Sequence, residues 1–401
     1  MEATAGPLAG LRVLDISTLI AGPLAATLLA DLGAEVVKAE LPHVGDPLRE
    51  LPPHDHGVPL WWKVTNRNKE GVTLDLRTPE GAGLFRRLLP QFDVLVENFR
   101  PGTLARWGFD TDTLMGLHPG LIILRVTGFG QSGPYAHRPG FARIFESLSG
   151  FTQLCGEADG PPMHLGFPIS DSVAALFGAI GILAAVHERT RDPQHRGQEI
   201  DLSATEAMFR LLDFLPIEYG RMRTVRGRTG NLNAYSAPSN IYRTLDGHWL
   251  SLAVSSPSLY RRLVEAIGRP DLATDPRFAT NRARIANRAE IETILTEWIG
   301  GRTAAEITAH FDQLGVACST VKTIDEIFED PQFQAREAIV TLDDNELGPV
   351  QMQCVVPRFS RTPGSIRSTG PALGQHNESV YGDRLGLSTE ERDAMRAAGA
   401  I

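Results

Sequence analysis

The chain has 401 residues, of which 42% are hydrophobic and 22% are charged, an ordinary composition for a globular protein. This length predicts two or three domains and excludes both a small disulfide-stapled scaffold and a disordered chain. The net charge of −9 argues against a nucleic-acid-binding protein, which needs a basic surface.

Signals for targeting and for metal binding are weak. Residues Met1–Gly10 lack the basic start and the apolar run of a signal peptide, and the longest apolar stretch, Ser172–Val186, is shorter than the roughly 20 residues that a bilayer requires. His54-Asp55-His56 stands alone in a proline-rich loop, and the three cysteines have no metal-ligand spacing, so no metal site is predicted. These features predict a cytoplasmic protein with no membrane partner and with reduced thiols.

Strand and helix signals alternate over the first 130 residues. Leu11–Ile16 has the pattern of a buried strand, Leu24–Leu32 that of a helix and Glu35–Ala39 that of the next strand,. Such a βαβ unit predicts a parallel sheet. Thr78-Pro79-Glu80 has the chemistry of a helix start. We therefore expect an α/β fold with a Rossmann-like open sheet. Further strand-like runs are Val72–Leu76, Val94–Val96 and Leu121–Val126.

The turn after the first expected strand, Ser17–Pro23, lacks the G-x-G-x-x-G pattern of dinucleotide-binding sites. This absence disfavours an NAD-dependent dehydrogenase.

A long helix is expected from Asp171 to about Arg191, after a segment rich in glycine and proline. Glycine is costly inside a helix, so Gly178 and Gly181 indicate close packing there. Glu199–Leu202 then has a strand pattern, and Ala204–Leu212 has a helix pattern,.

A basic, flexible segment, Arg221–Gly230, separates these elements from a region of different character. Asn240–Val254 has the pattern of a hairpin around Asp246-Gly247,. Near the end of the chain, Ser388 and Glu391 have the spacing of a capping box. Helices are expected at Pro257–Ile267, with Ser256 as N-cap, and at Arg288–Ile299 and Ala304–Leu314,.

Several short stretches, in order and with matching spacing, resemble the family III CoA-transferases. This formyl-CoA and carnitine CoA-transferase group also includes the α-methylacyl-CoA racemases. The stretches are Pro7–Asp15, Ala21–Pro23, Leu32–Lys38, Asn68-Lys69, Leu74–Leu76, Val96–Gly102, Gly128–Pro134 and Gly374–His376.

The resemblance implies a ring-shaped subunit that interlocks with a second copy to form a homodimer. With the patterns above, it predicts a large Rossmann-like CoA-binding domain at residues 1–200 and a linker at 201–230. A small α+β domain follows at 231–335, and residues 336–401 form a second linker and return to the large domain.

The resemblance assigns Asp171 as the catalytic nucleophile. A covalent aspartyl intermediate, first a mixed anhydride and then an aspartyl-CoA thioester, would carry CoA from an acyl-CoA to a free carboxylic acid. The helix N-terminus favours negative charge and should keep Asp171 ionised. The alternative is that Asp171 is only an N-cap, the commonest role of such aspartates.

The racemase branch of the family uses a histidine to move the α-proton, and Phe141 stands at that position here. A phenyl ring cannot transfer a proton, and His137 precedes the Pro-Gly turn. The sequence therefore favours a transferase. An acyl-CoA racemase or isomerase that uses Asp171 with another base, and a CoA-binding paralogue without catalysis, stay as alternatives.

The resemblance also implies which residues contact coenzyme A, the substrate that the protein would use without any prosthetic group. Leu74 and Leu76 would line the adenine, although a core role is equally consistent with their pattern. The arginines could be ordinary surface charges and Asn98 a turn cap. The expected contacts are Leu19, Ile20, Ala21, Leu74, Leu76, Arg77, Asn98, Phe99, Arg106 and Arg138.

Two departures from the formyl-CoA transferase pattern concern the acyl group. Ile20 replaces a glutamine, and Leu51 stands near the place of a lost tryptophan. We therefore expect a bulkier, less polar acyl group than formyl or oxalyl. The acceptor carboxylate calls for a nearby cation. Candidates are His164, Arg143 and the cluster Arg221, Arg223, Arg226 and Arg228.

Overall fold

The computed structural model describes residues 6–401. The chain divides into two compact units, which we call the large unit and the small unit. The small unit comprises Thr152–Met163 and Arg223–Gln334, and the large unit comprises His164–Met222, Ala335–Ile401 and the described part of Met1–Phe151. The expected boundaries at residues 200, 230 and 335 stay a prediction.

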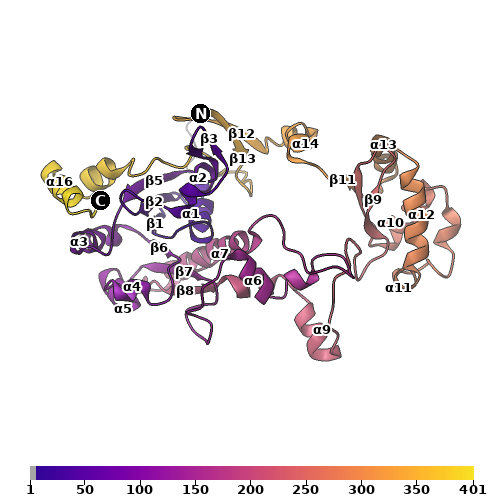
Figure 1. Cartoon of the computed structure of the whole chain (residues 1–401), viewed down its shortest axis with the longest axis horizontal. Helices are drawn as coiled ribbons and strands as arrows, with labels where there is room; N and C mark the ends of the chain where they lie inside the picture. The colour runs from indigo at the N-terminus through magenta and orange to yellow at the C-terminus, as the bar shows by residue number, and fades with distance from the viewer. Residues whose placement is uncertain (1–5) are drawn as a thin grey trace. The chain divides into compact units, whose positions relative to one another are not determined.

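A parallel sheet of six strands forms the centre of the large unit (Figure 1). In space the strands follow the order β5-β2-β1-β6-β7-β8, and every neighbouring pair is parallel. Counted in chain order among these six, this is the 3-2-1-4-5-6 order of doubly wound folds, with the switch point between β1 and β6. The expectation of an α/β fold with a parallel sheet is confirmed. The strands are β1 (Arg12–Asp15), β2 (Glu35–Glu40), β5 (Lys69–Thr73), β6 (Val94–Glu97), β7 (Ile122–Thr127) and β8 (Glu199–Ser203).

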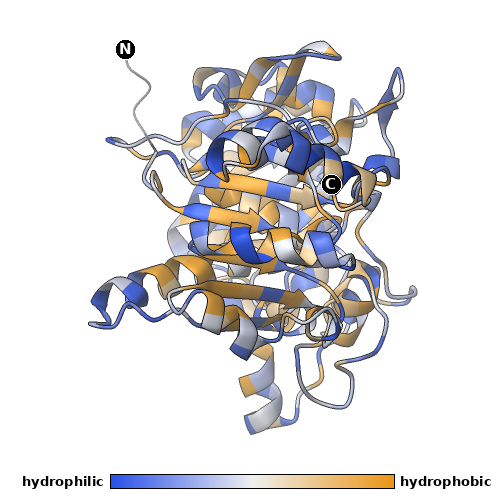
Figure 2. Ribbon diagram, turned by 90° about the vertical axis from the view of Figure 1, so that its left-hand side faces the viewer, coloured by the Kyte–Doolittle hydropathy of each residue, from blue (hydrophilic) through white to orange (hydrophobic). Residues whose placement is uncertain are grey.

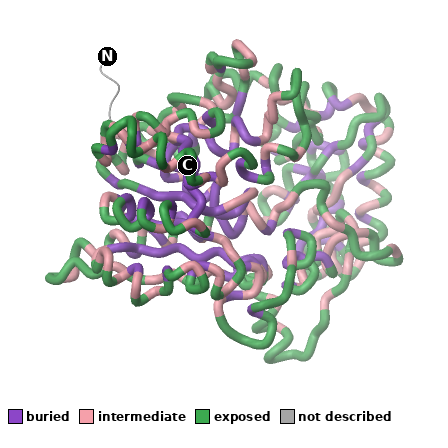
Figure 3. The backbone as a smooth tube through the Cα atoms, turned by 60° about the vertical axis from the view of Figure 1, so that its left-hand side comes forward, coloured by how far each residue is buried: buried purple, intermediate pink, exposed green. Residues whose placement is uncertain are grey.

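Helices cover both faces of this sheet because successive strand residues point to opposite sides. Val13 packs in one apolar cluster with α1 (Ala21–Asp31) and α7 (Ile169–Arg191). Leu14 packs in another with α3 (Pro79–Leu88). The strands are apolar in Figure 2 and buried in Figure 3, between more polar and exposed helices.

Two elements begin earlier than the sequence pattern predicts. β5 begins at Lys69 rather than Val72, because the Lys69 ammonium is neutralised by a buried aspartate and can enter the sheet. α7 begins at Ile169, so Asp171 lies inside its first turn and is not the N-cap. The alternative in which Asp171 is only an N-cap is therefore wrong.

The small unit has a three-stranded antiparallel sheet, in the order β11-β10-β9, packed against helices. The expected hairpin is confirmed as β9 (Ser239–Arg243) and β10 (Trp249–Ala253). Ser256 caps the following helix through the Leu259 N–H, as expected. The other elements of this unit are η3 (Thr152–Leu154), α10 (Pro257–Ala266), η4 (Pro270–Ala273), α11 (Asn281–Ala286), α12 (Arg288–Gly300), α13 (Ala304–Leu314), β11 (Cys318–Thr320), α14 (Ile324–Phe328) and α15 (Pro331–Ala335).

The segment Gly374–His376, one of the stretches that carries the family resemblance, covers the edge of the sheet. The Gly71 N–H of β5 donates to His376 Nδ1 at 2.9 Å, and the Thr73 N–H donates to Asn377 Oδ1 at 2.9 Å. An open strand edge invites pairing with other chains, so this motif protects the sheet.

Among the residues described, α7 has the length and composition of a membrane-spanning helix. It is 23 residues long and therefore exceeds the apolar stretch Ser172–Val186 that the sequence indicated. Its small residues Ala174 and Ala175 are buried against the core of the large unit, as in the core helix of a globular unit.

The remaining elements of the large unit complete its layers and loops. The expected helix at Ala204–Leu212 is α8, and the expected capping box at Ser388 and Glu391 is present in α16. These elements are η1 (Pro47–Glu50), β3 (His54–Asp55), β4 (Val58–Pro59), α2 (Leu60–Thr65), η2 (Leu89–Gln91), α4 (Thr103–Arg106), α5 (Thr111–Leu117), α6 (Ala142–Leu148), α8 (Ala204–Arg210), α9 (Leu215–Met222), β12 (Ile339–Asp344), β13 (Gly348–Gln353), η5 (Glu378–Arg384) and α16 (Thr389–Ala397).

Gly22 provides a test of how closely α1 approaches the turn after β1. A Cβ at this position would lie 2.4 Å from Ser17 Cβ, which is buried and cannot move freely. We expect Gly22→Ala to lower the free energy of unfolding by about 1–3 kcal/mol, measured by urea denaturation. Gly116→Ala on α5 is the control, because no atom lies within 4 Å of its new Cβ. An equal effect of the two substitutions would contradict this explanation.

Candidate active site

A buried ion network lies beneath the carboxyl end of β1. Asp15 is fully buried, and its Oδ2 lies 2.8 Å from Lys69 Nζ. Burial alone would raise the pKa of Asp15, but the nearby Lys38 and Lys69 ammonium groups hold it below its usual value,. Burial lowers the pKa of Lys69 to about 8, against the opposing charge of Asp15. The network therefore keeps a charged centre inside the sheet.

The same network fixes the turn that follows β1. Lys38 Nζ lies 3.2 Å from Asp46 Oδ2 and also donates to the Ser17 carbonyl. Asp46 Oδ1 accepts a hydrogen bond from the Leu19 N–H at 3.0 Å. Leu19 has φ of 65°, a conformation that is unusual for a side chain of this kind and needs such support.

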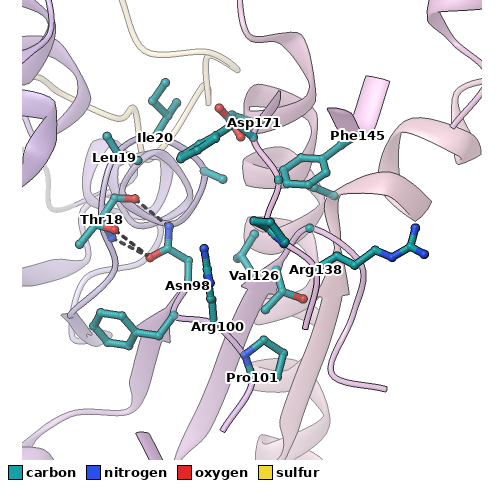
Figure 4. A pocket seen from close by; sticks show the side chains of 18 of the residues that line it. Thr18, Leu19, Ile20, Asn98, Arg100, Pro101, Val126, Arg138, Phe145 and Asp171 are labelled. Carbon is teal, nitrogen blue, oxygen red and sulfur yellow. Dashed lines mark hydrogen bonds between the residues drawn. The ribbon is translucent and has the colours of Figure 1, made fainter. Parts of the chain in front are cut away.

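Asn98 joins this turn to the turn that follows β6. Its side chain accepts from the Thr18 N–H and donates to the Thr18 carbonyl, both at 2.7 Å. Figure 4 shows these bonds across the switch point of the sheet. The turn-cap explanation for Asn98 is therefore replaced by a bridge between two strands, at the place where doubly wound sheets bind ligands.

A cavity of about 230 Å³ opens beside this bridge. In Figure 4, Thr18 and Asn98 lie on one side of it, Val126 and Arg138 lie on the other, and Asp171 reaches it from α7. One acidic side chain, Asp171, therefore faces a wall of mixed polar and apolar side chains. Of the expected site residues, Leu19, Ile20, Ala21, Asn98, Phe99, Arg138 and Asp171 line it.

Asp171 has an electrostatic environment unlike that of an ordinary helix N-terminus. Burial, and then the negative charge of Glu146 on α6, raise its pKa to about 6. The expected stabilisation of the anion by the helix is thus outweighed, although the carboxylate stays mostly ionised at neutral pH. A basic carboxylate is the better nucleophile, so this environment suits covalent chemistry.

A second cavity, of about 200 Å³, shares Thr18 and Phe99 with the first. Leu74 and Leu76 line it and are also part of the core, so both roles weighed from the sequence are present. Arg77 stands at its rim and pairs with Asp75 at 2.7 Å. Both cavities are lined by residues at or just after the carboxyl ends of strands in the parallel sheet.

Other expected contacts lie apart from the described cavities or have other partners. Arg106, in α4, lines neither cavity and donates to Thr103 Oγ1 at 2.9 Å. The Arg138 guanidinium stacks 3.7 Å from the Tyr135 ring. His164 bonds to Glu146, so it is not a free cation for an acceptor carboxylate. Leu51 packs beside Ile20 in a small apolar cluster rather than in the cavity wall.

Three residues that shape the site were not predicted from the sequence. Arg100 lines the first cavity and follows Asn98 within a stretch that carried the resemblance, which was a usable signal. Asp46 and Glu146 had no such signal, because their partners Leu19 and Asp171 are 27 and 25 residues away in sequence. Within residues 6–401 no group of three or more histidine, cysteine, aspartate or glutamate residues could hold a metal ion.

Comparison with known proteins decides the family. The profile of CoA-transferase family III matches residues 8–377. The chain belongs to CoA-transferase family III. The expectation of a CoA-transferase is thereby confirmed, and CoA-transferases use CoA thioesters as substrates. The dehydrogenase alternative is rejected.

Two relatives and one solved structure show how far the family likeness extends. Succinyl-CoA--D-citramalate CoA-transferase of Chloroflexus aurantiacus is 45% identical, over 98% of each chain. The β subunit of succinyl-CoA--L-malate CoA-transferase from the same organism is 41% identical, again over 98% of each chain. A CAIB/BAIF family protein from Brucella suis has 33% identity and a TM-score of 0.83, over 94% of this chain and 99% of that one.

Asp171 should lower the stability of the folded protein at neutral pH. Its pKa is raised from 3.8 to about 6 on folding, so its stabilising contribution is complete below pH 4 and is lost as the pH rises through 6. We expect Asp171→Asn to raise the free energy of unfolding at pH 7.5 by about 1–3 kcal/mol and to have little effect near pH 4. Urea denaturation at both pH values measures this, and an equal gain at both would contradict it.

Proposed function

We propose that this protein transfers CoA from an acyl-CoA to a free carboxylic acid through a covalent intermediate on Asp171. The observation that carries the proposal is the position of Asp171, whose pKa is raised to about 6, in the cavity at the switch point of the sheet. Family membership supports CoA transfer as the reaction.

The proposed reaction balances in four steps. An Asp171 oxygen attacks the thioester carbonyl, so that a C–O bond forms, the C–S bond breaks and the electron pair leaves with the CoA thiolate. The thiolate attacks the aspartyl carbonyl of the mixed anhydride and releases the donor as a carboxylate. The acceptor carboxylate then attacks the aspartyl-CoA thioester, which forms a second mixed anhydride and releases the CoA thiolate. The thiolate attacks the acceptor carbonyl of this anhydride, and the acceptor becomes the new CoA thioester. Asp171 is regenerated with no net proton change.

The two adjoining cavities suggest how CoA is placed. The adenine would lie in the second cavity, between Leu74 and Leu76, with Arg77 at the phosphates. The pantetheine would pass Phe99 and Asn98 and bring the thioester to Asp171. Arg100 and Arg138 stand at the first cavity as further partners for anionic groups,. Arg106 stays a proposed contact on the resemblance alone.

The substrates proposed are succinyl-CoA as donor and a hydroxylated dicarboxylic acid as acceptor. The support comes from the relatives that are 45% and 41% identical, a succinyl-CoA--D-citramalate and a succinyl-CoA--L-malate CoA-transferase. Ile20 in the cavity wall fits an acyl chain larger than formyl. The protein would act in the cytoplasm.

Covalent trapping tests the mechanism. The protein is incubated with a panel of acyl-CoAs that includes succinyl-CoA, treated with hydroxylamine or borohydride, and mapped by mass spectrometry. We expect modification at Asp171. Asp171→Ala should lose the label and at least about a thousandfold in kcat, whereas Asp213→Ala, at an exposed carboxylate, should retain both. CoA binding without any adduct, or α-proton exchange without CoA transfer, would overturn the mechanism in favour of the paralogue or isomerase alternative.

An interlocked homodimer is part of the proposal. Large apolar side chains are exposed along one run of helices, α6 to α9. Contiguous exposed apolar surface on a globular protein marks an interaction site, and a second copy would cover it. These side chains are Ile144, Leu148, Leu176, Ile180, Phe209, Ile217 and Met222.

Interlocking predicts unusual exchange behaviour. We expect a particle of twice 43.7 kDa by light scattering. Because interlocked rings cannot separate while folded, tagged and untagged dimers should form no hybrid after days of mixing, yet should form hybrids after joint unfolding and refolding. Hybrids in the native mixture would show a simple dimer, and a single-chain mass would rule out the dimer.

A further inference from the structure

Glu146 is a buried carboxylate whose two oxygens differ in their hydrogen bonding. Its side chain on α6 is 2% exposed. Oε2 lies 3.0 Å from His164 Nδ1, whereas Oε1 is buried and has no hydrogen-bond partner in the described residues. A buried acceptor without a donor is costly and is rare without a purpose. The environment therefore holds Glu146 in place but leaves part of its charge uncompensated.

Glu146 acts on Asp171 across the contact between α6 and α7. The two helix N-termini are tied together by the Ser170 hydroxyl, which donates to the Ala142 carbonyl at 3.0 Å. Burial makes the larger contribution to the raised pKa of Asp171, and the charge of Glu146 raises it further.

The other charged groups on the elements packed against α7 are exposed or have partners elsewhere. They are Asp31 with Arg67, Arg125 with Glu97 and Glu199, Asp201 with the Gln131 N–H, and the exposed Arg143, Glu206 and Arg210.

Two carboxylates held together away from water repel each other strongly. Attack by Asp171 on a thioester relieves this repulsion, because the new anhydride is neutral and the negative charge leaves with the CoA thiolate. Resting on the function proposed above, we propose that Glu146 is a positioning residue that destabilises the free Asp171 carboxylate and so favours its acylation. The contact with His164 Nδ1 fixes the orientation of the Glu146 side chain.

The two members of the pair make graded predictions. Glu146→Gln removes the repelling charge, so the acid limb of the pH profile of kcat/KM should move down by about one pH unit, and the plateau should fall about tenfold. His164→Leu removes the contact that holds Glu146 in position, so the acid limb should move in the same direction but by less.

Conservative variants separate this role from a structural one. Glu146→Asp keeps the charge and should leave the limb nearer to that of the wild type than Glu146→Gln does. His164→Gln keeps a donor and should shift the limb less than His164→Leu. Glu206→Gln is the control and should leave the acid limb in place. Glu206 is exposed, and its helix α8 packs against α7 as α6 does.

The experiment measures full pH profiles of the intact protein, with succinyl-CoA as donor, beside mass-spectrometric labelling of Asp171 in each variant. A downward movement of the acid limb in Glu146→Gln, with a smaller downward movement in His164→Leu, supports the inference. Lower plateaus with an unmoved limb would overturn it and leave the covalent mechanism intact, provided that the wild-type protein is labelled. Absence of label in the wild type would overturn both.

Discussion

The buried Asp15 carboxylate between Lys38 and Lys69 is the interaction on which the site depends. One anion between two cations in the dry interior is stable only if all three are held in register, and the parallel pairing of β1 with β2 provides that register. Its remaining donors and acceptors reach outward to Ser17 and, through Asp46, to the backbone of Leu19. An ion cluster inside the sheet thereby determines the shape of the turn that borders the active-site cavity.

The switch point of the sheet lies beside that turn and leaves room for a ligand. Because the chain winds in opposite directions from β1 and β6, no crossover helix blocks the gap between the strand ends. Asn98 closes part of this gap by bonding to both polar groups of the Thr18 backbone. The two cavities on either side share Phe99.

The electrostatics of α7 balance two opposing demands. The nucleophile that we propose must be ionised, which the helix N-terminus favours, and it must be basic, which burial and the charge of Glu146 favour. A pKa of about 6 satisfies both at neutral pH, since most of the carboxylate is then ionised and still basic. Holding Asp171 in this environment lowers the stability of the folded protein at neutral pH,. The packing of small residues of α7 against α1 keeps Asp171 in place.

The sequence by itself determined what depends on neighbours in the chain. Strand and helix alternation, the hairpin of the small unit and the caps at Thr78, Ser256 and Ser388 follow from residues a few positions apart. Tertiary structure decided what depends on distant partners. It placed Glu146 beside Asp171, Lys69 against Asp15 across 54 positions and His376 against Gly71 across 305. It also joined the first turn of α7 to α6, through the bond from the Ser170 hydroxyl to the Ala142 carbonyl.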